Sequence, residues 1–288
     1  MNIYTTPYAL QRAGAKIYNV INATFFIANP TITIITCTGN IQVHTIYNGI
    51  ATTETYSNLT DTALSLKADA ETLVRIVGDV TAITFPYDGT YLGSISEPYR
   101  LKTIITANCR SLKSLAVTGA TKLTSLDLSK NTALTSLECN YCTSITSLDL
   151  SRNTELTNLT CSDTGITSLD LSKNTELTRL NCSDTDITSL DLSKNTALTS
   201  LECSSTGITS LDLSKNTELT RLNCDNCKGI TSIKCNASKM NITTSISSII
   251  KQATSTTGTV TVFEPLTYAS TIKTAATNKG WSYSEDDE

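Results

Sequence analysis

Cysteine is the residue type whose spacing in this chain could support chemistry. The sequence holds ten cysteines and a single histidine among 288 residues. Two pairs have the C-x-x-C spacing that in other proteins holds zinc or forms a local disulfide, Cys139 with Cys142 and Cys224 with Cys227. Five cysteines also recur at one position of a repeated segment: Cys139, Cys161, Cys182, Cys203 and Cys224. What these thiols can do depends on how the repeat stacks them.

The repeated segment has a period of 21 residues, with 22 in its first and last copies. Copies begin at residues 123, 145, 166, 187 and 208, and the third reads ITSLDLSKNTELTRLNCSDTD. A degenerate copy begins at residue 101 and a half copy at residue 230. Each copy divides into halves of the form LxxLxLxxN and LxxLxCxxT, whose alternate apolar positions point to one side in a strand. We therefore expect a solenoid of stacked coils with these side chains in its core.

An asparagine closes the first half of every copy. We expect its amide to donate to and accept from backbone groups at the turn. These residues are Asn131, Asn153, Asn174, Asn195 and Asn216.

The pattern resembles the leucine-rich repeat family over residues 101 to about 238. It looks most similar to the 21-residue repeats of internalin-type and of gut-bacterial or phage surface proteins, in which a cysteine replaces one core leucine. The resemblance implies that the five recurring cysteines form a structural ladder in the core. Thr164, Thr185 and Thr206 stand where the family usually has asparagine, so this edge departs from the family's hydrogen-bonding pattern.

The spacing of stacked strands limits what the cysteines can bind. Four rungs of about 4.8 Å separate the two C-x-x-C pairs by about 19 Å, so they cannot share a zinc ion with Zn–S bonds of about 2.3 Å. Stacked Cβ atoms about 4.8 Å apart are also wider than the roughly 3.5–4.5 Å that a disulfide prefers. We expect the ladder cysteines to be small buried apolar side chains. A local bridge within either C-x-x-C pair stays open.

The remaining chain surrounds this solenoid, and the predicted fold is mainly β with short helices. Alternating apolar and polar residues from 31 to 58 predict antiparallel strands, and an apolar segment at about 7–28 predicts a helix that packs on them or docks into a partner assembly. At the other end we expect a β-α-β cap whose first helix begins at Thr244 or Ser245 and whose second ends at Gly280. The predicted divisions are 1–29 helical anchor, 30–100 β-rich domain, 101–240 leucine-rich-repeat solenoid and 241–288 cap.

Composition and motifs argue against several functions. The net charge of −4 leaves no basic surplus for nucleic acid. His44 has no matching acid or nucleophile in a known motif, and no phosphate loop or HExxH occurs, so we predict no enzyme activity, no cofactor and no metal. No apolar run reaches the roughly 20 residues of a membrane span. Asn19 and Asn22 interrupt the first apolar stretch, so we do not interpret it as an export signal.

Outward positions of the repeat are of two kinds. One half-coil is constant and carries an acidic column beside a basic one, with Asp170 and Lys173 in the third copy, which predicts a solubilising surface or, alternatively, a calcium strip. The other half-coil varies between copies, as recognition positions do, although recent duplication without a ligand would give the same pattern. The predicted ligand-binding residues are Ser136, Glu138, Tyr141, Asn158, Arg179, Asn181, Glu202, Arg221 and Asn223.

These observations favour a non-enzymatic binding protein in one of three settings. The first is a bacteriophage virion surface protein, as decoration, head fibre or tail component, that meets its assembly partners through residues 1–95. The alternatives are a bacterial cell-surface adhesin of internalin type and an intracellular scaffold. The expected partner of the first two is a protein or glycan on a cell surface. A homo-oligomer would add avidity.

Overall fold

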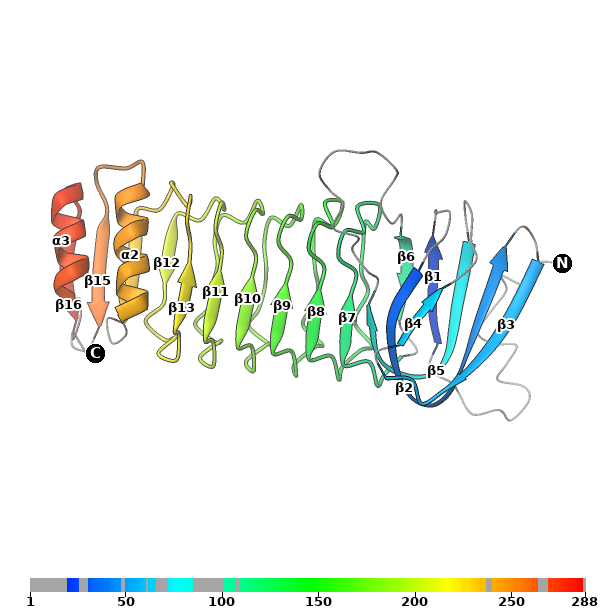
Figure 1. Cartoon of the computed structure of the whole chain (residues 1–288). Coiled ribbons are helices and arrows are strands. Elements are labelled where there is room, and N and C mark those ends of the chain that lie inside the picture. The colour runs from blue at the N-terminus through cyan, green and yellow to red at the C-terminus, as the bar shows by residue number, and fades with distance from the viewer. Residues whose placement is uncertain are drawn as a thin grey trace.

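The cysteine-containing half of each repeat forms the strands of the solenoid. In the computed structural model, which describes residues 20–25, 31–47, 50–60, 62–65, 72–84, 101–106, 109–236, 240–263 and 269–286, these strands stack in parallel along one side (Figure 1). Their central leucines pair directly, Leu159 with Leu180 and Leu180 with Leu201, and are buried. The strands are β7 (Ser114–Ala116), β8 (Ser136–Glu138), β9 (Asn158–Thr160), β10 (Arg179–Asn181), β11 (Ser200–Glu202) and β13 (Arg221–Asn223).

The predicted leucine-rich-repeat solenoid is therefore confirmed, with one refinement. In the described residues, the LxxLxL half forms a strand within the full copies only at β12 (Ser210–Asp212), and elsewhere it runs as turns. Leucines of both halves nevertheless enter one continuous core, as Leu169 and Leu171 do in the third copy. The alternating pattern thus predicts which side chains are buried, whereas hydrogen bonding between coils decides which half is a strand.

The turn asparagines are buried and connect successive coils. The Nδ2 of Asn174 donates to the carbonyls of Leu150 at 3.1 Å and Asn153 at 2.8 Å in the preceding coil. The predicted donor role is confirmed, but the Oδ1 atoms of Asn153, Asn174, Asn195 and Asn216 accept no hydrogen bond. On the opposite edge the threonines close their own turns, since the Thr185 hydroxyl donates to the carbonyl of Cys182 at 2.7 Å.

The N-terminal strands continue the same sheet. β2 pairs antiparallel with β3, β4 and β5, and β1 lies between β5 and β6, which confirms the antiparallel strands predicted from residue 31. β5 then pairs in parallel with β7, where the buried Ile83 lies opposite Leu115. The sheet and the hydrophobic core are therefore continuous between the N-terminal strands and the solenoid. The strands are β1 (Val20–Phe25), β2 (Thr31–Tyr47), β3 (Ile50–Ser57), β4 (Thr62–Ser65), β5 (Thr72–Thr84) and β6 (Leu101–Ile105).

The helix predicted at about 7–28 is wrong over Val20–Phe25, which form β1. This segment contains β-branched and aromatic residues that suit a strand, and its backbone pairs on both sides, with β5 and with β6. Partners distant in sequence therefore outweigh the local apolar pattern. The rest of the predicted helix lies outside the described residues.

A cap of alternating helices and strands closes the C-terminal end. α2 (Met240–Gln252) lies against β13, and α3 (Ala269–Lys279) follows it (Figure 1). The strands β14 (Ser232–Asn236), β15 (Thr259–Phe263) and β16 (Ser282–Asp286) extend the sheet begun by β12. The β-α-β order and the end of α3 at Gly280, where φ is +83°, agree with the prediction.

The predicted start of the first cap helix is wrong, because α2 begins at Met240, before Thr244 and Ser245. Ser245 has a different role, since its hydroxyl donates to the carbonyl of Leu222 at 2.8 Å and so satisfies the edge of β13. None of the helices in the described parts of the chain is long and apolar enough to cross a membrane.

Candidate binding face

Eight of the nine predicted ligand-binding residues lie on one face of the parallel sheet. Each short strand buries its central leucine and turns its first and third residues outward, as Arg179 and Asn181 do on either side of Leu180. We call the outward residues of β8, β9, β10, β11 and β13 the strand face. Its first column is Ser136, Asn158, Arg179, Ser200 and Arg221, and its second is Glu138, Thr160, Asn181, Glu202 and Asn223.

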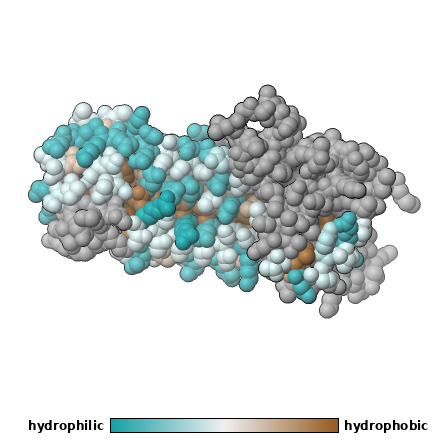
Figure 2. Space-filling view, in the orientation of Figure 1, coloured by the Kyte–Doolittle hydropathy of each residue, from teal (hydrophilic) through white to brown (hydrophobic). Residues whose placement is uncertain are grey.

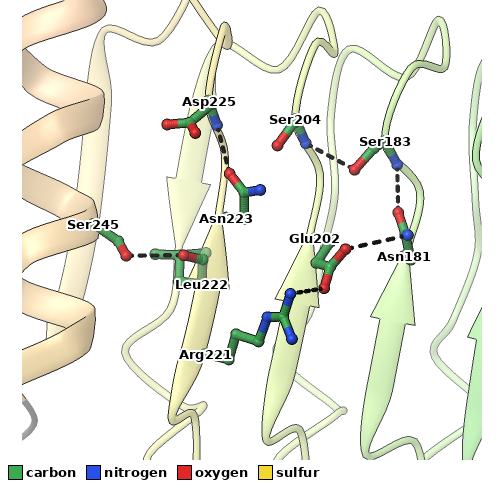
Figure 3. Close-up of polar contacts among 9 residues, drawn as sticks. All are labelled: Asn181, Ser183, Glu202, Ser204, Arg221, Leu222, Asn223, Asp225 and Ser245. Carbon is green, nitrogen blue, oxygen red and sulfur yellow. Dashed lines mark hydrogen bonds and ion pairs between the residues drawn. The ribbon is translucent and has the colours of Figure 1, made fainter.

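A polar network crosses three strands of this face. Glu202 of β11 uses both carboxylate oxygens: Oε1 lies 2.9 Å from a guanidinium nitrogen of Arg221, and Oε2 accepts from the Nδ2 of Asn181 at 3.3 Å (Figure 3). The Glu202 side chain is only 27% exposed, whereas that of Arg221 is 70% exposed. The network therefore fixes the carboxylate while the arginine remains open to solvent. An exposed pair of this kind contributes about 0–1 kcal/mol to stability, so orientation is its main effect.

The amides at the strand ends are also fixed. The Oδ1 of Asn181 accepts from the backbone N–H of Ser183 at 3.0 Å, and the Ser183 hydroxyl accepts from the N–H of Ser204 at 3.2 Å (Figure 3). Near β9, Asn140 donates to the Thr160 hydroxyl at 3.2 Å. Sequence reasoning missed the column that holds Asn140, Ser183 and Ser204, although it too varies between copies.

Arg179 is the cation of the strand face that no carboxylate neutralises. Its side chain is exposed on β10, between Asn158 of β9 and Ser200 of β11. Within the described part of the chain it forms no ion pair. Its neighbours in the first column, Asn158 and Ser200, are uncharged, so an anionic group of a ligand can approach the guanidinium directly.

Tyr141 lies beyond the end of β8 and is strained. Its φ is +59°, and the equivalent turn residues Asp163, Asp184, Ser205 and Asn226 share this left-handed conformation. Aspartate and asparagine tolerate it, but a bulky aromatic residue does so at a cost. Among the described residues Tyr141 is the exposed large hydrophobic side chain, at 43%.

A threonine ladder borders the face. The Thr157 hydroxyl donates to the carbonyl of Thr135 at 3.0 Å, and the Thr178 hydroxyl donates to that of Thr157 at 3.1 Å. Because these hydroxyls are used between coils, their constancy in the repeats is structural. The neighbouring columns of the strand face are the ones that vary between copies. Figure 2 shows the described part of this side as mainly hydrophilic or intermediate in hydropathy, with a narrow apolar band.

The constant acidic column forms local turns. The Oδ1 of Asp170 accepts from the N–H of Ser172 at 2.9 Å, and hydrogen bonds from this serine lower the pKa of the Asp170 carboxyl. Asp127, Asp149 and Asp191 make the same contact with the serine two residues on, and their pKa values are lowered as well. Across the described residues, no group of three or more metal-ligating side chains comes together.

The five ladder cysteines are buried, as predicted. All ten cysteines are free thiols, so neither C-x-x-C pair is bridged. Burial raises the pKa of Cys182 to about 12 and also raises the pKa of Cys161. His44 lies in β2, where its backbone is paired with Thr53 and Arg75.

Comparison with known proteins gives structural neighbours of low similarity. No protein-family profile and no curated protein matches the chain. A structure of the functional domain of InlJ from Listeria monocytogenes, described as including a cysteine ladder, is 25% identical with a TM-score of 0.40, covering 65% of this chain and 42% of that one. The Arabidopsis receptor kinase HAESA, in complex with the peptide hormone IDA and the co-receptor SERK1, is 16% identical with a TM-score of 0.39, covering 72% and 34%. Internalin InlF of L. monocytogenes is 14% identical with a TM-score of 0.22, covering 72% and 87%. The chain thus spans less than half the length of the first two.

Proposed function

We propose that this chain is a non-enzymatic recognition protein that binds a cell-surface protein or glycan through its strand face. The proposal is supported by a difference between positions within nearly identical copies: some positions are constant and structural, and others vary and are exposed. Leucine, cysteine, asparagine and threonine occupy constant positions that build the core and link the coils. The outward strand positions differ from copy to copy and are displayed side by side. Variation concentrated at displayed positions is typical of a binding surface.

The chemistry of the strand face indicates what the partner must present. Arg179 supplies an unneutralised guanidinium, Glu202 an oriented carboxylate, and Asn158 and Ser200 neutral donors and acceptors. Each comes from a strand whose backbone is fixed on both sides, so ordering these groups costs little on binding. The partner is expected to offer an anionic group opposite Arg179 and several hydroxyl or amide groups around it.

The substitutions that test this proposal replace residues by those that other copies carry. Arg179→Ser, Glu202→Asn and Arg221→Ser together reproduce side chains found at the same positions in neighbouring coils. Binding of the fluorescently labelled chain to intact bacterial cells is expected to fall at least roughly tenfold, since each lost charged contact is worth about 1.5–3 kcal/mol. The matched control changes Asp149, Asp170 and Asp191 to Ser in the constant column. Equal losses for both triple variants would contradict the proposal.

The setting we propose is a bacteriophage virion surface, with residues 1–95 as the attachment to the particle. A bacterial adhesin is the alternative, and an intracellular scaffold the second. Mass spectrometry with N-terminal peptide mapping can compare purified particles, cell envelopes and cytosol from a culture that produces the chain. Stoichiometric recovery in particles with an intact N-terminus supports the virion. Recovery in envelopes after trimming near residue 30 supports the adhesin, and recovery in cytosol supports the scaffold.

A further inference from the structure

Two ladder cysteines near the cap, Cys203 and Cys224, have sulfur atoms that lie closer together than an ordinary packing contact. The Sγ atoms of Cys203 and Cys224 are 2.7 Å apart, although the residues occupy equivalent positions in successive coils. Unbonded heavy atoms pack at about 3.5–4.0 Å, whereas a disulfide bond measures about 2.05 Å. The separation of the two sulfurs is therefore nearer to a bond than to a packing contact.

A third thiol adjoins this pair. Cys227 occupies the position that Thr164, Thr185 and Thr206 hold in the inner coils, and its Sγ lies 3.0 Å from the carbonyl of Cys203 and 3.3 Å from the Thr206 hydroxyl. Hydrogen bonds from the thiols of Cys203 and Cys224 lower the pKa of Cys227. Thiolate is the form that reacts in disulfide exchange. The lowered pKa in this cluster is that of Cys227, whereas the pKa values of Cys203 and Cys224 are raised by hydrogen bonds among the three thiols and by burial.

The opposite end of the solenoid provides a comparison. Cys142 is the counterpart of Cys227, and its Sγ donates to the carbonyl of Val117 at 3.0 Å. The ladder position in that preceding coil is therefore valine, and no thiol faces Cys142 from it. Burial raises the pKa of Cys142 to about 11. The two C-x-x-C pairs thus have the same spacing but different surroundings.

We propose that Cys203 and Cys224 form a disulfide by exchange with a low-molecular-weight disulfide such as oxidised glutathione. The two protein thiols are oxidised to one S–S bond, and the S–S bond of glutathione is reduced. Its two sulfurs leave as two thiols that carry the two protons. The new bond joins the last two full coils beneath α2, which lies against β13. This site is independent of ligand binding at the strand face.

Peptide mapping distinguishes the candidate bonds directly. The folded full-length chain is incubated with oxidised glutathione, denatured in an alkylating agent and cleaved with trypsin. A bond from Cys203 links peptide 195–215 to peptide 222–228, whereas a bond between Cys224 and Cys227 stays within 222–228. The expected result is the linked pair, with the other eight of the ten cysteines alkylated. A bond within 222–228, or full alkylation, would overturn the proposal.

Variants assign the bond and control for damage to the core. Cys203→Ala and Cys161→Ala each remove one buried ladder thiol, but only Cys203→Ala should abolish the linked peptides and the oxidant-dependent rise in melting temperature. Cys227→Ser should retain the linked peptides, because Cys227 is not a member of the bond. Loss of the link in Cys227→Ser but not in Cys224→Ser would instead show that Cys227 is the partner of Cys203.

Discussion

Alanine substitutions in the turn asparagines, which we call the asparagine ladder, should lower the free energy of unfolding by unequal amounts. The ladder consists of Asn131, Asn153, Asn174, Asn195 and Asn216. Asn174→Ala removes two hydrogen bonds, to the carbonyls of Leu150 and Asn153. Both carbonyls keep a backbone donor, from the N–H of Asn153 and of Leu156. Two lost hydrogen bonds cost about 1–3 kcal/mol, but the unpaired Oδ1 of Asn174, itself a cost of about 1 kcal/mol, is removed as well. We expect the free energy of unfolding to fall by about 1–2 kcal/mol.

Asn131 is the comparison within the same ladder. Its Nδ2 donates to the carbonyls of Thr106 and Cys109 at 3.0 and 2.8 Å, and its Oδ1 accepts from the Thr106 hydroxyl at 2.6 Å. Asn131→Ala therefore loses three hydrogen bonds and relieves no unpaired atom. It also weakens the bonding of the buried Thr106 hydroxyl. The expected loss is about 3 kcal/mol.

Guanidinium unfolding followed by circular dichroism measures both losses. Because solenoids can unfold in stages, amide hydrogen exchange of Asn153 and Leu156 provides a local measurement for Asn174→Ala. A loss for Asn174→Ala that equals or exceeds that for Asn131→Ala would refute the hydrogen-bond reasoning. It would show that packing of the amide, rather than its pairing, determines the stability of the ladder.

Three further predictions concern single positions. Cys182→Ser should lower the free energy of unfolding by roughly 1–3 kcal/mol because it buries a hydroxyl, and Cys182→Leu should also destabilise by overpacking; a denaturant midpoint unchanged in both would contradict tight packing of the ladder. Tyr141→Asn should raise the free energy of unfolding by about 0.5–1 kcal/mol, because asparagine tolerates the left-handed conformation better than tyrosine, and Asp163→Tyr should lower it. A melting temperature that falls for Tyr141→Asn or rises for Asp163→Tyr would argue against strain at this turn. Because the pKa of Asp170 is lowered in the fold, its carboxylate stabilises the folded state above the unfolded pKa, and this contribution is lost as pH falls through the folded pKa. Changing Asp127, Asp149, Asp170 and Asp191 to Asn should therefore make the free energy of unfolding depend less on pH below about 5. An unchanged pH dependence would exclude the acidic column as its source.

The repeat predicts the core because burial follows a period that a single copy displays. Leu180 and Cys182 are buried in every equivalent coil, and Asn174 links its coil to the one before it, as the LxxLxC and LxxLxLxxN patterns indicate. Val20–Phe25 show the limit of this reasoning. Their strand is determined by pairing with β5 and β6, which lie about 50 and 80 residues further along the chain.

The same distinction applies to cap residues. Ser245 suits a helix N-terminus on local grounds, yet its hydroxyl bonds to Leu222, more than twenty residues earlier, and the helix starts at Met240. Asp163 and Asp184 adopt a left-handed backbone conformation, which their residue type indicates only weakly, because aspartate tolerates this conformation without requiring it. Tyr141 adopts the same conformation because its coil stacks on the next one, where its N–H donates to the carbonyl of Ser162 at 2.9 Å.

The strand face combines both kinds of information. Copy-to-copy variation identifies its residues, but the network of Asn181, Glu202 and Arg221 exists only because three particular copies follow one another. If the coils of Asn181 and Glu202 exchanged places, every core and ladder position would be preserved, yet Arg221 would face an amide in place of a carboxylate. The fold is therefore encoded within each repeat, whereas the binding chemistry is encoded in the order of the repeats. Arg179 remains unneutralised for the same reason, since the strands beside it carry Asn158 and Ser200 in its column and its neighbours there have no charge to pair with it.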